Sequence, residues 1–94
     1  MIISYYGAIR AAAGKSGEEV SVAKESTVYQ LLRSIANVHG DGFFGEIFEA
    51  DSGELREDLT VTVNDKAIDH ALVLSYTLTM DDKLALFPIF PGGG

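Results

Sequence analysis

One amphipathic segment, residues 27–40, most constrains how this chain can fold. Its apolar residues recur at the three- and four-residue spacing of a helix. Ser26 or Thr27 can cap the start of that helix, and Gly40 follows its last turn, where helices often end. The apolar residues of the predicted stripe are Val28, Leu31, Leu32, Ile35 and Val38. A helix with one apolar stripe must bury it against another layer of structure.

Alternating segments before and after the helix predict that this layer is a sheet. Their apolar and polar residues alternate as they do along half-buried strands. The predicted strands are residues 1–7, 18–23, 59–63, 67–68 and 84–87. Asn64 and Asp65 lie between two of them and indicate a hairpin turn. A helix that follows a hairpin and precedes further strands must cross one face of a mixed sheet. We therefore expect an α+β fold of the β-grasp type with one main helix.

The remaining segments carry weaker signals. Residues 8–13 are rich in alanine and favour a turn of helix. Residues 43–48 are mostly apolar, and we expect a covering loop or a short turn of helix there, because glycines interrupt the segment. Residues 69–76 fit no single pattern. Pro88 and Pro91 are expected to prevent regular sheet pairing and to keep the end of the chain extended.

Composition bounds the class of protein. A chain of 94 residues, 47% of them hydrophobic, forms one domain with one core. It contains no cysteine, which excludes a disulfide framework, a thiolate metal site and a cysteine nucleophile. The net charge of −7 and the scattered lysines argue against binding to nucleic acid. The apolar runs are too short to span a membrane, and the start lacks the basic residues of a signal peptide. We therefore expect a cytoplasmic protein that binds no membrane.

The body of the chain offers no pattern of catalytic or metal-binding residues. His39 and His70 are its only histidines, and they lack the spacing of metal ligands. We expect His39, at the end of the helix, to interact with the helix dipole. Asp81 and Asp82 are adjacent, which favours a turn over acid–base catalysis. We therefore expect no metal site, no bound cofactor and no catalytic activity of the chain by itself.

The chain ends in three consecutive glycines, residues 92–94. Glycines contribute no packing and lose the most backbone entropy on ordering, so they bring no benefit to a folded end. Fully extended at about 3.3–3.6 Å per residue, residues 89–94 can reach roughly 20 Å into a narrow channel and present the Gly94 carboxylate there. We predict a domain over residues 1–88 and a flexible tail over residues 89–94. A disordered tail without function is the alternative.

Taken together, these residues resemble the small subunit of molybdopterin synthase and, more broadly, the ubiquitin-like sulfur carriers of prokaryotes. The similarity runs nearly end to end. It covers the opening strand with Ala8-Ile9-Arg10 and Gly14, the capped helix, the hairpin at Val61–Asp65, the turn at Asp81–Lys83, and the ending Leu84–Pro88 before the glycines. The ending is the specific part of this pattern.

The resemblance implies a function carried by the end of the chain. An E1-like adenylating enzyme of the MoeB/ThiF type would use ATP to adenylate the Gly94 carboxylate, and sulfur would then replace AMP to leave a thiocarboxylate. Gly93 and Gly92 would form the slender lead that enters the large subunit of molybdopterin synthase (MoaE type), where the sulfur passes to a pterin precursor. The residues expected to bind these partners are Phe87, Pro88, Ile89, Phe90 and Pro91.

The sequence of the tail does not identify the pathway that receives the sulfur. The usual family ending is Phe-Pro-Pro, two further residues and Gly-Gly, whereas here Ile89 replaces the second proline and a third glycine follows. Either the channel of the partner is deeper, or Gly94 is trimmed, or the sulfur enters another pathway such as thiamin synthesis, cysteine synthesis or tRNA thiolation. The same activation also suits a ubiquitin-like protein modifier, whose terminal glycine forms an isopeptide bond with lysines of its targets. A β-grasp interaction domain with an inert tail is the remaining alternative.

Overall fold

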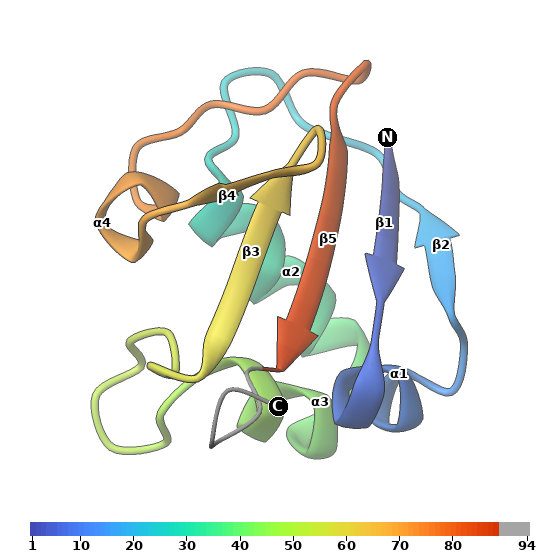
Figure 1. Ribbon diagram of the computed structural model, residues 1–94, viewed down its shortest axis with the longest axis vertical. Coiled ribbons are helices and arrows are strands. Elements are labelled where there is room, and N and C mark those ends of the chain that lie inside the picture. The colour runs from blue at the N-terminus through green and yellow to red at the C-terminus, as the bar shows by residue number, and fades with distance from the viewer. Residues whose placement is uncertain (89–94) are drawn as a thin grey trace.

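The computed structural model describes residues 1–88, and residues 89–94 lie outside that range. Five strands form one mixed sheet in the order β2-β1-β5-β3-β4 (Figure 1). The strands are β1 (Ile2–Tyr5), β2 (Gly17–Glu19), β3 (Leu59–Val63), β4 (Lys66–Ile68) and β5 (Lys83–Pro88). The helices are α1 (Gly7–Ala13), α2 (Val28–His39), α3 (Asp41–Ile47) and α4 (His70–Val73).

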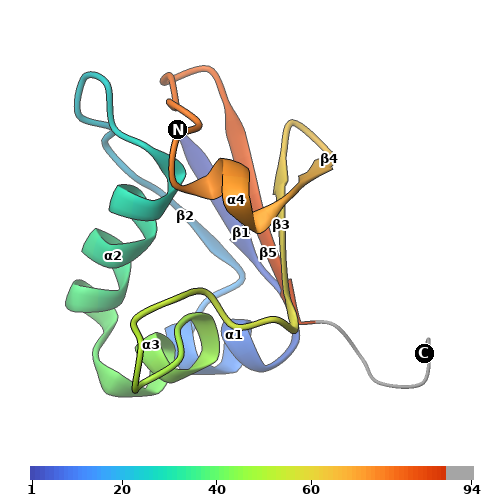
Figure 2. The same cartoon turned by 90° about the vertical axis from the view of Figure 1, so that its left-hand side faces the viewer.

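The pairing of the strands confirms the β-grasp arrangement. β1 and β5 run parallel to each other. The other pairs are antiparallel: β2 with β1, β3 with β5, and β4 with β3. α2, the longest helix, crosses one face of the sheet, and within residues 1–88 no helix covers the opposite face (Figure 2). The fold is therefore α+β, with one main helix on a mixed sheet, as the sequence predicted.

α2 begins and ends where the sequence predicted. Thr27 and Gln30 form a capping box, in which Thr27 Oγ1 accepts a hydrogen bond from the Gln30 N–H at 3.2 Å and Gln30 Oε1 accepts one from the Thr27 N–H at 3.0 Å. At the other end, the Gly40 N–H donates to the Ala36 carbonyl. Gly40 has a φ of 95°, which favours glycine over residues with a side chain. Both ends of the helix are therefore set by local signals.

The apolar stripe of α2 is buried except at one predicted position. The confirmed members, each at most 6% exposed, are Val28, Leu31, Leu32 and Ile35. Val38 is 81% exposed, so its assignment to the buried stripe is wrong. At 3.6 residues per turn, Val38 lies roughly 80° around the helix from Val28, at the margin of the stripe. Val20 and Ser21, which follow β2, line a hollow together with Val38 and do not cover it.

β2 is shorter than the predicted strand over residues 18–23. It spans Gly17–Glu19, and its last residue lies opposite Ile2, where β1 begins. Val20 still exchanges two hydrogen bonds with Met1, the residue before β1, at 2.8 and 3.1 Å. Val20 and Val22 still pack against the edge of the core, which accounts for the alternation seen in the sequence.

α3 occupies the segment for which the sequence allowed a covering loop or a short turn of helix. Phe43 and Ile47 of this helix and the following Phe48 are fully buried. Burial of each such side chain stabilises the fold by about 1.5–3 kcal/mol. A glycine within a helix costs only about 1 kcal/mol. A Cβ at Gly42 or Gly45 would meet no atom within 4 Å, so both glycines face open space. The helix forms because the burial of the apolar side chains outweighs the cost of the two glycines.

The predicted hairpin and the predicted turn contact each other. Asn64 and Asp65 have φ values of 53° and 69°, as in a two-residue type I′ hairpin. The Asn64 side chain donates to Asp82 Oδ1 at 2.9 Å and accepts from the Lys83 N–H at 2.9 Å. A hydrogen bond from the Thr79 N–H, together with the one from Asn64, lowers the pKa of Asp82. This network fixes the start of β5, the strand that leads to the tail.

A polar cluster joins β1, β2 and the end of α2. The Tyr5 hydroxyl donates to Glu18 Oε2, and His39 Nε2 lies 2.6 Å from the same oxygen. Burial alone would raise the pKa of Glu18, but the hydrogen bonds from Tyr5 and His39 outweigh it and lower that pKa. Because an ionised carboxylate only accepts, His39 Nε2 carries a proton in this pair. The sequence placed His39 near the helix dipole but did not indicate its contact with Glu18.

Candidate functional site at the exit of the C-terminal tail

β5 carries the chain to the end of the sheet where the tail begins. Its last two residues, Phe87 and Pro88, lie opposite Thr60 and Leu59 of β3. The expectation that Pro88 prevents regular pairing is therefore wrong, because a proline at the end of a strand removes only one N–H from the ladder. Leu59 is 2% exposed and anchors this end of the sheet in the core. The last described residue is thus held at a fixed position, which we call the tail exit.

An aromatic pair lies beside the tail exit on the face of the sheet that α2 does not cover. The rings of Tyr6 and Phe87 stack, with 4.4 Å between their centroids and 9° between their planes. Tyr6 is 45% exposed, and Phe87 is half-buried. The Tyr6 N–H donates to the Leu86 carbonyl at 3.2 Å, which holds the two strands together next to the rings. Exposed aromatic side chains are enriched in protein-binding surfaces.

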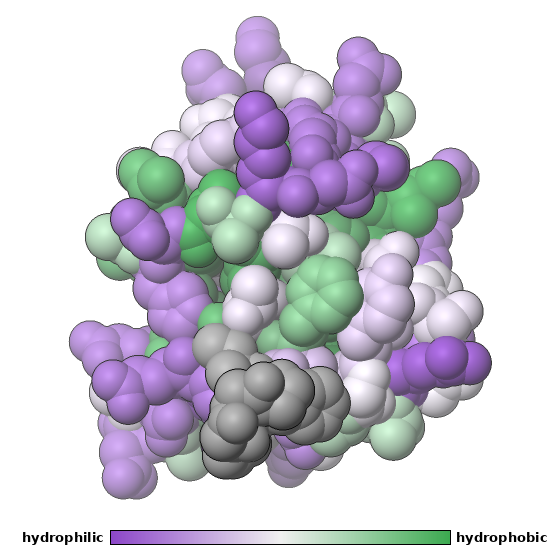
Figure 3. All heavy atoms as spheres, in the orientation of Figure 1, coloured by the Kyte–Doolittle hydropathy of each residue, from purple (hydrophilic) through white to green (hydrophobic). Residues whose placement is uncertain are grey.

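The open face around this pair is shallow, and its centre carries no charge. A hollow of about 260 Å³ runs across β1, β3 and β5. Its uncharged lining includes Ser4, Tyr6, Thr62, Ala85 and Phe87. Asp65 and Lys83 lie at the end remote from the tail exit, where they form an ion pair at 3.3 Å. Figure 3 views this face and shows apolar and neutral side chains across its middle. Such a surface suits contact with another protein.

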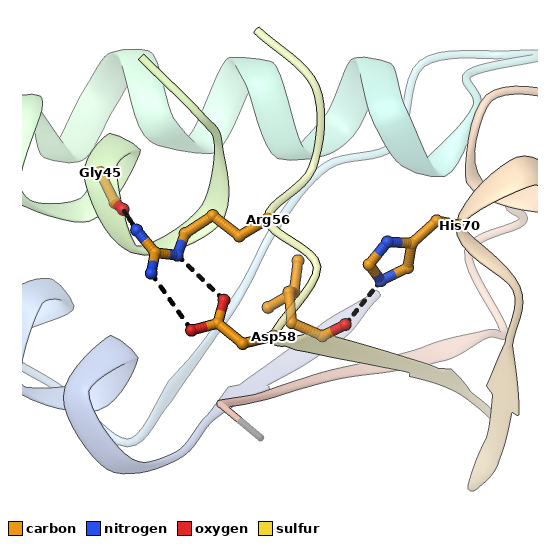
Figure 4. Close-up of polar contacts among 5 residues, drawn as sticks. Gly45, Arg56, Asp58 and His70 are labelled. Carbon is orange, nitrogen blue, oxygen red and sulfur yellow. Dashed lines mark hydrogen bonds and ion pairs between the residues drawn. The ribbon is translucent and has the colours of Figure 1, made fainter. Parts of the chain in front are cut away.

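Two sets of hydrogen bonds hold the loop that leads into β3 at the tail exit (Figure 4). Arg56 binds both carboxylate oxygens of Asp58, at 3.0 and 3.1 Å, and donates to the Gly45 carbonyl of α3 at 3.3 Å. His70 Nε2, at the start of α4, donates to the Leu59 carbonyl at 2.6 Å. The hydrogen bond from Arg56 lowers the pKa of Asp58, so this pair stays charged at neutral pH. The loop and α4 are thereby both fastened to the residues around the exit.

The structure describes two of the predicted site residues and adds others next to them. Phe87 and Pro88 lie at the tail exit. The other predicted site residues lie outside the described residues: Ile89, Phe90, Pro91, Gly92, Gly93 and Gly94. Sequence reasoning missed Tyr6 as a partner of Phe87, because alternation along the first strand does not show which strand lies beside it. It also missed Arg56. The one sequence signal that could have singled out this residue is that it is the single basic residue in an acidic segment.

Among residues 1–88, no three His, Asp or Glu side chains are placed so that they could hold a metal ion. None of the helices in this range is long and apolar enough to cross a membrane.

Solved structures of known proteins share this fold over nearly the whole chain. SAMP1 from Haloferax volcanii is 28% identical, with a TM-score of 0.83 over 99% of this chain and 98% of that chain. A putative molybdopterin converting factor subunit 1 from Pyrococcus furiosus is 22% identical, with a TM-score of 0.71 over 95% of each chain. A chain of the BexX/CysO complex from Amycolatopsis orientalis is 22% identical, with a TM-score of 0.74 over 98% of each chain. The last two likenesses show the fold alone.

The sequence also matches a known protein family. No curated protein matches the chain. The ThiS family matches residues 3–93, a range that spans all of the sheet except Ile2 and reaches into the terminal glycines. Because this match covers nearly the full length, the chain belongs to the ThiS family of ubiquitin-like sulfur carriers and modifiers.

Proposed function

We propose that this chain is a sulfur carrier that acts through its terminal carboxylate. The observation that carries the proposal is the family match, which includes the glycines as far as residue 93. The geometry of the exit supports it. β5 brings the chain to the end of the sheet, and the exposed Tyr6–Phe87 pair lies beside the point where the tail begins. A partner protein that holds the tail can contact this pair at the same time.

The proposed reaction takes place at Gly94. A carboxylate oxygen attacks the α-phosphorus of ATP, pyrophosphate leaves, and an acyl-adenylate forms. A donor that supplies sulfur at the oxidation level of sulfide then attacks the carbonyl carbon and AMP leaves, which gives the thiocarboxylate without an oxidant. Glycine residues leave room for the backbone to approach the nucleotide closely. An E1-like adenylating enzyme of the MoeB/ThiF type supplies the active site and binds the ATP, while this chain is its co-substrate.

We further propose that the thiocarboxylate donates its sulfur in molybdopterin biosynthesis. The large subunit of molybdopterin synthase (MoaE type) would then be the second partner of the tail. The support is the ending Leu84–Pro88 followed by glycines, which resembles the ending of the small subunit of that enzyme. In this proposal the activating enzyme and the synthase bind the same open face in turn, because each must reach the same carboxylate.

A protein modifier is the second candidate function. It is favoured by the 28% identity to SAMP1 from Haloferax volcanii, a small archaeal modifier protein, over 99% of this chain. Adenylation of Gly94 is common to both candidates. They differ in the nucleophile that displaces AMP or a later leaving group, which is sulfur in the carrier and a lysine amine of a target in the modifier.

Intact mass spectrometry of the protein purified from its native host tests the proposed function. A carrier should show a form heavier by about 16 Da, because sulfur replaces one oxygen of the terminal carboxylate. That form should disappear in a strain that lacks the activating enzyme. Conjugates of much higher mass, with Gly94 joined to lysines of other proteins, would support the modifier instead. A single unmodified mass under every growth condition would contradict both.

Phe87→Ala should weaken the interaction with the activating enzyme without unfolding the protein. We expect the apparent KM for this chain in pyrophosphate exchange to rise about tenfold, since loss of a central aromatic contact commonly costs 1.4 kcal/mol or more. The melting temperature should fall by only a few degrees, because Phe87 is half-buried on the open face. Ile2→Ala is the matched control: Ile2 is 54% exposed and lies at the opposite end of β1. An equal effect of both substitutions would rule out a specific contact at the exit.

A further inference from the structure

A second surface lies next to the tail exit, at the edge of the sheet where α4 packs. A cleft of about 390 Å³ runs between α4 and the loop at residues 52–57. Apolar side chains of Leu55, Ala71 and Leu74 contribute to its lining, and the carboxylates of Glu54 and Glu57 belong to the same lining. The chemistry of sulfur transfer described above makes no use of this cleft.

The two walls of the cleft are fixed in place. The Tyr29 hydroxyl of α2 donates to the Gly53 carbonyl at 2.8 Å, which ties the loop to the main helix. The hydrogen bond from His70 to the Leu59 carbonyl ties α4 to the start of β3. Val73 of α4 is fully buried and holds the helix against the core. The cleft is therefore preformed, so a partner would spend little free energy on ordering it.

The lining combines exposed apolar surface with negative charge. Leu74 is 62% exposed, and it lines the same cleft as two exposed glutamates, Glu54 and Glu57. Within residues 1–88 neither glutamate takes part in an ion pair. The segment 46–58 carries six of the 14 acidic residues of the chain, and its single basic residue, Arg56, is bound to Asp58. A basic group that enters the cleft would therefore meet unneutralised negative charge.

We propose that this cleft binds an aliphatic side chain and a neighbouring arginine or lysine of the enzyme that activates the tail. The aliphatic group would cover Leu55, Ala71 and Leu74, and the basic group would pair with Glu54 and Glu57. Charge complementarity selects this occupant over a neutral or acidic segment. The position favours a partner that holds the tail, because His70 lines the cleft and also bonds to Leu59, which lies opposite Pro88. The activating enzyme is the first such partner in the proposed reaction. The inference rests on the proposed function, since it assigns a docking site to the same partner.

The charge-neutral double substitution Glu54→Gln with Glu57→Gln tests the electrostatic part. In pyrophosphate exchange with the cognate activating enzyme, we expect the apparent KM for this chain to rise about tenfold while kcat stays unchanged. Added salt should raise the KM of the unaltered protein steeply and that of the double variant much less. The control, Glu19→Gln with Asp81→Asn, removes the same number of exposed charges from β2, at the far edge of the sheet, and from the turn before β5. It should change KM less than twofold.

A pair of leucine substitutions tests the apolar part. Leu74, the residue directly after α4, lines the cleft, whereas Leu72 of α4, which is 48% exposed, does not. Leu74→Ala should therefore raise the KM about threefold, and Leu72→Ala should leave it unchanged. Both leucines are largely exposed, so the melting temperature should stay within a few degrees in each variant, which a thermal scan checks.

The possible outcomes separate the cleft from the proposed function. If the unaltered protein is adenylated and both cleft variants show a raised KM, the docking site stands. If the unaltered protein is adenylated and the cleft variants behave like their controls, the docking site is refuted and the sulfur carrier remains. If the unaltered protein supports no pyrophosphate exchange with the activating enzyme, the proposed function fails and the docking site fails with it.

Discussion

Deletion of Gly93 and Gly94 should abolish adenylation and leave the fold intact. The described pairing of β5 ends at Pro88, opposite Leu59, and glycines have no side chain to pack, so we expect the sheet and its core to form without the last two residues. Without the two glycines, the carboxylate would sit on Gly92, directly after a proline and too far back to reach the nucleotide. At about 3.3–3.6 Å per residue the reach shortens by roughly 7 Å. We expect no pyrophosphate exchange above background with the cognate activating enzyme and a melting temperature within a few degrees of the unaltered protein.

Two further variants sharpen this test of the tail. A residue appended after Gly94 should also block adenylation, because it places a Cβ beside the carboxylate in a channel shaped for glycine. Deletion of Gly94 alone distinguishes a trimmed tail from a longer channel. If the third glycine is removed in the cell, this variant should be fully active, and if the channel matches the longer tail it should be slow. Normal adenylation of the Gly93-Gly94 deletion would overturn the assignment of the terminus as the reactive group.

Local signals allowed the sequence to predict α2 and the strands that precede and follow it along the chain. The capping box of Thr27 and Gln30 and the glycine at position 40 are encoded by neighbouring residues, and the structure contains both. Val38 is a residue for which local signals gave the wrong prediction. Helical spacing places Val38 at the margin of the stripe, and whether another element covers that margin depends on tertiary packing, which the spacing does not report.

The residues around the tail exit were harder to predict, because they come from opposite ends of the chain. The stack of Tyr6 on Phe87 requires the parallel pairing of β1 with β5, and alternation within one strand does not identify its neighbour. Arg56 reaches both Asp58, two residues away, and Gly45 of α3. The first contact can be inferred from the sequence, but the second depends on how α3 packs. The glycines at the terminus, by contrast, can be identified as candidate site residues from the sequence alone.

Leu32→Ala should lower the free energy of unfolding by about 2–5 kcal/mol, as buried leucine truncations do. Leu32 is fully buried in the core cluster between α2 and the sheet, so the shorter side chain loses apolar contact and leaves a cavity. Val38→Ala on the same helix is the matched control. Val38 is 81% exposed, and alanine has the higher helix propensity, so this change should stay within about 0.5 kcal/mol of zero. Urea titrations of both variants measure the difference. A loss below half a kcal/mol for Leu32→Ala, or equal losses for the two, would show that the helix presents a different face to the sheet.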